Sequence, residues 1–149
     1  MREQITEQLK TAMKAGDKSR VAALRMIQAK IKDVDIEARG AGKEVTDADL
    51  LAALQKMIKS RQESAQIYAQ NGREELAAQE NAEIAVIGEF LPKQMSEDEV
   101  SAAIKAAIAE TGAASMKDMG KVVGVLKAKY TGQMDFAKAS AAVKAALSG

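Results

Sequence analysis

A single proline, Pro92, stands in a chain of 149 residues that contains 30 alanines and only four aromatic residues. Alanine has the highest helix propensity of the natural residues, whereas strands favour β-branched and aromatic side chains. Helices usually end before a proline, so helices can lie on either side of position 92. These features predict an all-α fold with no sheet and a joint near Pro92.

Apolar residues recur at helical spacing in about seven segments, and each segment has residues that can start or stop a helix. The stop signals are Gly16, Gly40-Ala41-Gly42, Asn71-Gly72, Pro92, Gly112 and Gly132. The start signals are Asp17, Thr46 with Asp49, Ser96 with Glu99, Ser115 with Asp118, and Asp135. We therefore expect an N-terminal helical domain with an antiparallel hairpin, residues 1–92, followed by a three-helix domain, residues 93–149.

The composition excludes most catalytic centres. The chain has no cysteine and no histidine, which rules out disulfides, thiolate nucleophiles, Cys/His zinc sites and Ser-His relays. Paired carboxylates such as Glu74-Glu75 lie in predicted first helical turns, where negative charge suits the helix dipole. The sequence thus predicts no catalytic residues, no metal site and no cofactor, and it leans away from an enzyme.

One arginine and one glutamate lie where apolar residues are expected. Helical angles place Arg61 and Glu80 inside the apolar arcs of two consecutive helices, on either side of the Asn71-Gly72 turn. An antiparallel hairpin brings them to nearly the same level, with Glu83 one turn further along. We interpret the three residues as a partly buried ion pair that fixes the hairpin register, and a functional carboxylate is the minority interpretation.

Two sets of basic residues stand out, although the net charge is only +1. One set recurs every seven residues off the apolar face of the second predicted helix, over roughly 30 Å. It consists of Lys18, Arg25, Lys32 and Arg39. Such a stripe could track phosphates, and it could equally be a solvated helix face.

The second set lies near the C-terminus, where the chain from position 115 onwards has six lysines and only two aspartates. Two glycines four residues apart allow another backbone to approach closely, and lysines flank them. These residues are Lys117, Gly120, Lys121, Gly124 and Lys127. Packing between helices explains the glycines as well as ligand approach does.

Several stretches in the same order resemble the GatB/YqeY family along nearly the whole chain. The N-terminal stretches are Arg20-Val-Ala-Ala-Leu-Arg25-Met26, Lys59-Ser-Arg61-Gln-Glu-Ser64, Arg73-Glu-Glu-Leu76 and Phe90-Leu91-Pro92-Lys93-Gln94. The tail stretches are Asp118-Met-Gly120-Lys-Val122-Val-Gly124-Val-Leu126-Lys127, Gly132-Gln-Met-Asp135 and Val143-Lys144-Ala-Ala-Leu147. The tail is similar to the last domain of the B subunit of the glutamine-dependent Asp-tRNA/Glu-tRNA amidotransferase.

The resemblance implies a two-part multihelical fold and a non-catalytic module directed at tRNA. An accessory component of a glutamine-dependent amidotransferase, a carbon-nitrogen ligase, is the first alternative, and a protein-interaction adaptor is the second. Expected partners are tRNA and, beyond it, amidotransferase subunits or a tRNA synthetase. No apolar run is long enough to cross a bilayer and the first ten residues lack a signal-peptide core, so we expect a cytoplasmic protein without membrane contact.

Overall fold

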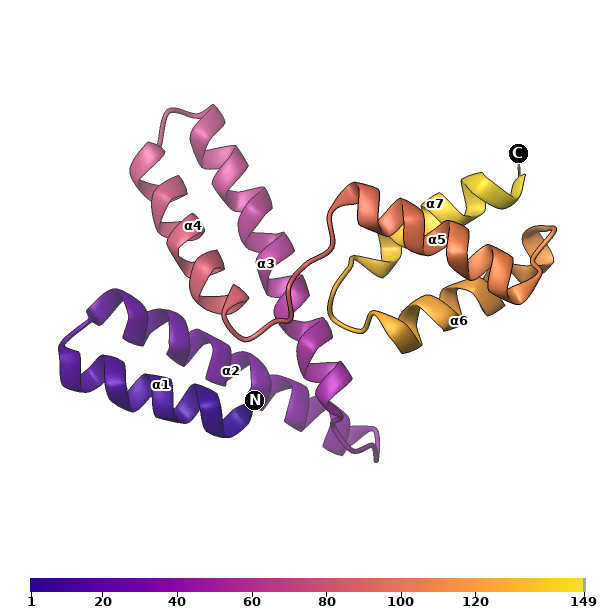
Figure 1. The fold of residues 1–149 in the computed structure, drawn as a ribbon. Coiled ribbons are helices and arrows are strands. Elements are labelled where there is room, and N and C mark those ends of the chain that lie inside the picture. The colour runs from indigo at the N-terminus through magenta and orange to yellow at the C-terminus, as the bar shows by residue number, and fades with distance from the viewer. Residues whose placement is uncertain (149) are drawn as a thin grey trace. The chain divides into compact units, whose positions relative to one another are not determined.

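The computed structural model describes residues 1–148, which form seven α-helices, one short 3-10 turn and no strand (Figure 1). The predicted all-α class is therefore confirmed for this part of the chain. The helices are α1 (Arg2–Ala15), α2 (Lys18–Gly40), α3 (Asp47–Gln70), α4 (Glu74–Gly88), α5 (Glu97–Thr111), α6 (Met119–Lys129) and α7 (Phe136–Ser148), and the 3-10 turn η1 (Met116–Asp118) precedes α6.

Local signals in the sequence set most helix ends. The Asp17 carboxylate caps α2 by accepting a hydrogen bond from the backbone N–H of Arg20. Capping boxes form at the start of α3, between Thr46 and Asp49, and at the start of α5, between Ser96 and Glu99. These three starts lie where the sequence predicts them.

Two helix ends differ from the prediction. Helix α4 ends at Gly88 rather than at Pro92, because Glu89, Phe90 and Leu91 donate to carbonyls three residues back instead of four. The helix expected to begin at Ser115 with Asp118 starts with the 3-10 turn η1, and its α-helical part starts at Met119. The Asp118 carboxylate accepts from the N–H of Ala114, and the 3-10 turn takes up the first residues of the expected helix.

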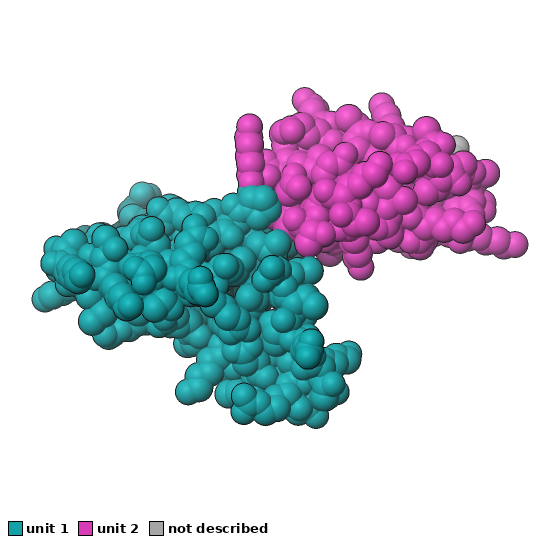
Figure 2. All heavy atoms as spheres, turned by 60° about the horizontal axis from the view of Figure 1, so that its bottom comes forward, with its two compact units in different colours: residues 1–92 teal, residues 93–149 magenta. Residues whose placement is uncertain are grey.

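Residues Met1–Pro92 and Lys93–Gly149 form two compact units, coloured teal and magenta in Figure 2. In the first unit, α1 pairs with α2 and α3 with α4, and α2 also packs on α3 and α4 (Figure 1). That these units are separately folding domains stays a prediction. The core of the first unit consists of Ile5, Ala12, Leu24, Ile27, Ile31, Leu50, Leu54, Ile87 and Phe90.

In the second unit α5, α6 and α7 pack on one another. Its core is built on the fully buried side chains of Val122, Leu126 and Val143, with small alanines between the helices. The backbone N–H of Met95 donates to the carbonyl of Gln133 at 2.9 Å, and this bond ties the segment before α5 to the turn before α7. Among residues 1–148, no helix is long and apolar enough to cross a membrane.

Candidate nucleic-acid interface

The basic stripe predicted on the second helix lies on the exposed side of α2. Lys18, Arg25, Lys32 and Arg39 are all exposed, whereas the core side of the helix holds Leu24 and Ile27. None of the four cations forms an ion pair with a carboxylate in the described part of the chain. Their charges therefore face solvent, as either of the two interpretations of the stripe requires.

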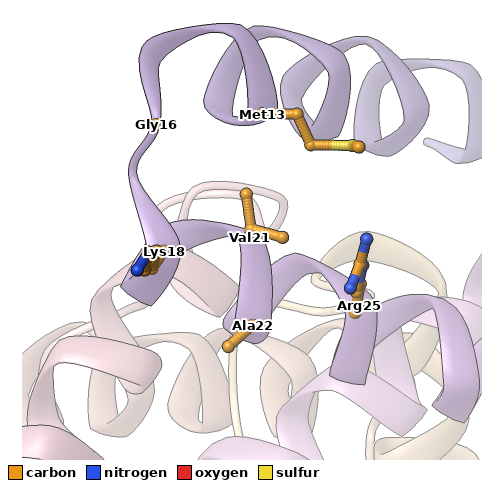
Figure 3. Close-up of a pocket in the computed structure, with 6 residues that line it drawn as sticks. All are labelled: Met13, Gly16, Lys18, Val21, Ala22 and Arg25. Atoms are coloured by element: carbon orange, nitrogen blue, oxygen red, sulfur yellow. The ribbon is translucent and has the colours of Figure 1, made fainter.

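A hollow of about 370 Å³ lies beside the N-terminal half of this stripe, between the end of α1 and the start of α2. In Figure 3, Val21 and Arg25 point from α2 toward α1, and Met13 projects from α1 above them. Met13 is 54 % exposed. Lys18 and Arg25 line this apolar hollow, so the stripe borders an apolar patch at one end.

The glycines of the second basic set lie on the outer face of α6. Gly120 and Gly124 are exposed, and a Cβ atom added at either position would meet nothing within 4 Å. Lys121 and Lys127 are exposed beside them, and Lys117 precedes them in the 3-10 turn. Packing of a helix of the second unit therefore does not explain these glycines.

Arg61, Glu80 and Glu83 meet between α3 and α4 as their helical angles predict. Arg61 Nη1 lies 3.3 Å from Glu80 Oε2 and 2.9 Å from Glu83 Oε2, and Nη2 lies 3.2 Å from the Met26 Sδ atom on α2. The three charged side chains are only 19, 20 and 14 % exposed. The Arg61 Nε atom is buried and has no hydrogen-bond partner among the described residues. One guanidinium thus joins three helices.

Ion pairs at the surface tie other helices together. Arg2 on α1 donates to both carboxylate oxygens of Asp35 on α2, and its hydrogen bond lowers the pKa of Asp35 below the ordinary range. Arg20 donates to Gln8 on α1 and pairs with Glu89 beyond α4. Helical spacing does not predict these contacts, because their partners lie 12 to 69 positions apart.

A second hollow, also of about 370 Å³, lies where α2, α3 and α4 meet. Helical periodicity does not predict this hollow, because its two lysines come from different helices and belong to no periodic set. It is lined by Lys30, Lys56, Met57, Ser60, Arg61, Ser64 and Glu80. Within residues 1–148 no group of three or more acidic residues could hold a metal ion.

Comparison with known proteins gives a family for this chain. No curated protein matches the sequence. The family model described as Yqey-like protein matches residues 2–147, which is nearly the whole chain and includes both compact units. The matched range includes the Arg61 stretch on α3 and the Gly120–Gly124 stretch on α6. The protein therefore belongs to the YqeY-like family.

Proposed function

We propose that the protein is a non-catalytic module that binds a folded RNA, with tRNA as its target. The observation that supports this best is the exposed face of α6, where two open glycines lie among Lys117, Lys121 and Lys127. Lysine charges there neutralise phosphates, and the missing Cβ atoms leave room for a ribose-phosphate backbone to come close to the helix.

The stripe on α2 contributes a second set of phosphate contacts. Its four cations follow one face over about 30 Å, and each lies roughly 10 Å from the next along the helix axis. Exposed cations without carboxylate partners release counterions from RNA without first losing an ion pair of their own.

The target is folded rather than single-stranded RNA. Recognition of unpaired bases relies on stacking against aromatic side chains, and the chain has only two tyrosines and two phenylalanines. Phe90 is buried in the first core, and Tyr68, Tyr130 and Phe136 are each partly buried. Contacts with phosphates and riboses, which read the shape of the RNA, fit this surface better.

Binding of tRNA at increasing salt concentration tests the proposal. Total tRNA and poly(U) of equal length are titrated into the full chain from low to physiological salt. We expect tighter binding to tRNA, with log affinity falling by about 0.7 to 0.9 per phosphate contact for each unit of log salt. No binding of tRNA even at low salt would refute it. Retention of amidotransferase subunits from a lysate, without RNA, would instead support the accessory alternative.

A further inference from the structure

The hollow where α2, α3 and α4 meet contains charges that the fold does not use. Arg61 and Glu80 line it, but they already pair with each other at 3.3 Å, and Glu83 completes that cluster. Lys30 on α2 and Lys56 on α3 also line the hollow. Neither lysine forms an ion pair within the described residues. One guanidinium serves two carboxylates, so that cluster carries one net negative charge, and the two lysines leave the hollow positive by one charge.

Hydroxyl groups stand next to these charges. Ser60 and Ser64 follow Lys56 at intervals of four residues, so all three side chains lie along one side of α3. Serine hydroxyls donate hydrogen bonds to anionic oxygens. Arg61 adds donor capacity, because its Nη2 atom contacts only the Met26 thioether, which is a weak acceptor. The hollow thus combines two lysines with two serine hydroxyls and a guanidinium N–H.

We propose that this hollow binds a phosphoryl group. A tetrahedral group with two negative charges can contact Lys30 from α2 and Lys56 from α3 and still present oxygens to the two serines. A single carboxylate carries only one charge to share between the two lysines. The volume of about 370 Å³ is at the lower end of the range for small-molecule sites, which suits a phosphate or pyrophosphate.

This site is distinct from the stripe proposed to face RNA. Lys30 and Lys32 differ by two positions, and therefore by about 200° around α2, so they lie on opposite sides of the helix. The phosphoryl group can belong to a free phosphorylated molecule or to the terminal phosphate of an RNA, since a backbone phosphodiester carries only one charge. Because inorganic phosphate alone is enough to detect the site, the inference does not depend on the proposed function.

Titration of the full chain with inorganic phosphate, and separately with pyrophosphate, tests the site. The amide chemical shifts of Ser60 and Ser64 are followed at low ionic strength, and chloride at matched ionic strength is the reference. We expect a saturable shift at these residues and weaker binding, by tenfold or more, in the double variant Lys30→Gln/Lys56→Gln. The double variant Lys14→Gln/Lys43→Gln removes two exposed lysines of the same unit and should bind as the wild type does.

Ser60→Ala/Ser64→Ala is a second variant, which removes only neutral donors from α3 and should fold normally. It should weaken phosphate binding several-fold. Shifts spread over all lysines, or unchanged binding in Lys30→Gln/Lys56→Gln, would overturn the proposal. Titration of Lys30→Gln/Lys56→Gln with tRNA distinguishes a free phosphorylated molecule from an RNA phosphate. Loss of phosphate binding alone assigns the site to a free phosphorylated molecule, and loss of both assigns it to an RNA phosphate.

Discussion

The protein has two basic faces, one on α2 in the first unit and one on α6 in the second. They differ in how much helix stability their residues lose. On α2 the cations alternate with good helix formers, such as Ala22 and Ala29, and a solvated surface helix needs no further explanation. On α6 two glycines occupy helical positions that face open space. Gly124, in the helix interior, costs about 1 kcal/mol of helix stability relative to alanine, and Gly120 lies in the first turn of α6.

Packing within the second unit does not offset this loss of helix stability. A glycine inside a helix often lets a neighbouring segment pack closely, but nothing lies within 4 Å of a Cβ atom built at Gly120 or Gly124. The face of α6 is therefore the stronger candidate for contact with another molecule, and the stripe on α2 is the weaker one. Both faces carry abundant positive charge, so charge alone does not rank them. They differ in the helix stability that the glycines of α6 cost.

Charge reversal on each face should give the largest effect and test this ranking directly. We expect Lys121→Glu/Lys127→Glu to lower tRNA affinity by about 100-fold at low salt, and Arg25→Glu/Lys32→Glu by about tenfold, because closer approach strengthens each phosphate contact. Filter binding or fluorescence anisotropy measures both affinities.

Controls of equal charge change are available in each unit. Lys105→Glu/Lys144→Glu alters exposed lysines on α5 and α7, and Lys14→Glu/Lys43→Glu alters exposed lysines of the first unit. If these controls lose as much affinity as the α6 variant, only net charge matters and the comparison between the faces fails.

Loss of the Arg61 cluster should destabilise the first unit and leave the stability of the second unchanged. Arg61→Met leaves Glu80 and Glu83 side by side without a cation, and we expect a loss of about 2 kcal/mol in the unfolding free energy of the first unit. The two tyrosines report the units separately, since Tyr68 lies in the first and Tyr130 in the second. Urea unfolding is therefore followed by tyrosine fluorescence in a Tyr130→Phe and in a Tyr68→Phe background.

The second unit should keep its midpoint in this experiment. Arg73→Met, which removes an exposed arginine in the turn before α4, should leave both midpoints unchanged. A common shift of both tyrosine signals in Arg61→Met would show that the two units unfold as one, and would end the prediction of two domains.

Replacing the open glycines should sharpen the comparison further. Gly124→Ala meets no steric obstacle, so we expect it to stabilise the second unit by about 0.5–1 kcal/mol. The same variant should weaken tRNA binding several-fold if a backbone approaches this face. Thermal unfolding and RNA titration of one protein preparation measure both effects. A stabilised variant with unchanged affinity would remove the argument for close approach at α6.

The smallest effect concerns the capping boxes, one in each unit. Backbone hydrogen bonds from Thr46 and Ser96 lower the pKa values of Asp49 and Glu99. A carboxylate with a depressed folded pKa stabilises the fold above its unfolded pKa of about 4, and this contribution fades as the pH falls through the folded value. In Asp49→Asn and Glu99→Gln, the unfolding midpoint of the unit that carries the change should therefore fall less steeply as the pH is lowered.

Glu63→Gln, at an exposed position of α3, is the control for this titration and should leave the acid limb as it is. The two tyrosine backgrounds again assign each change to a unit. An acid limb that stays equally steep in Asp49→Asn and Glu99→Gln would show that other carboxylates dominate the pH dependence.

The sequence predicted what depends on neighbours along the chain. The caps at Thr46 and Ser96 and the meeting of Arg61 with Glu80 follow from spacing within a helix or across one tight turn. The early end of α4 did not, because the stop at Gly88 competes with an apolar pattern that continues to Leu91. Phe90, which follows the end of α4, is buried in the first core, and this burial was not predicted either.

The candidate site was predictable only in part, for a similar reason. The stripe on α2 and the set on α6 are periodic within one helix, so spacing reveals them. Lys30 and Lys56 share a hollow only because α2 packs on α3, and Met26 reaches Arg61 across the same junction. Such groupings depend on how helices pack, and periodicity within one helix carries no information about that.

The short turns between paired helices have a consequence for synthesis on the ribosome. Helices α1 and α2 are joined at Gly16-Asp17, and α3 and α4 at Asn71-Gly72-Arg73, so many contacts form between residues close in sequence. Chains rich in local contacts fold within microseconds to milliseconds, whereas translation adds about 5–20 residues per second. We therefore expect the core of residues 1–92 to close as soon as α4 emerges, before the second unit has been made.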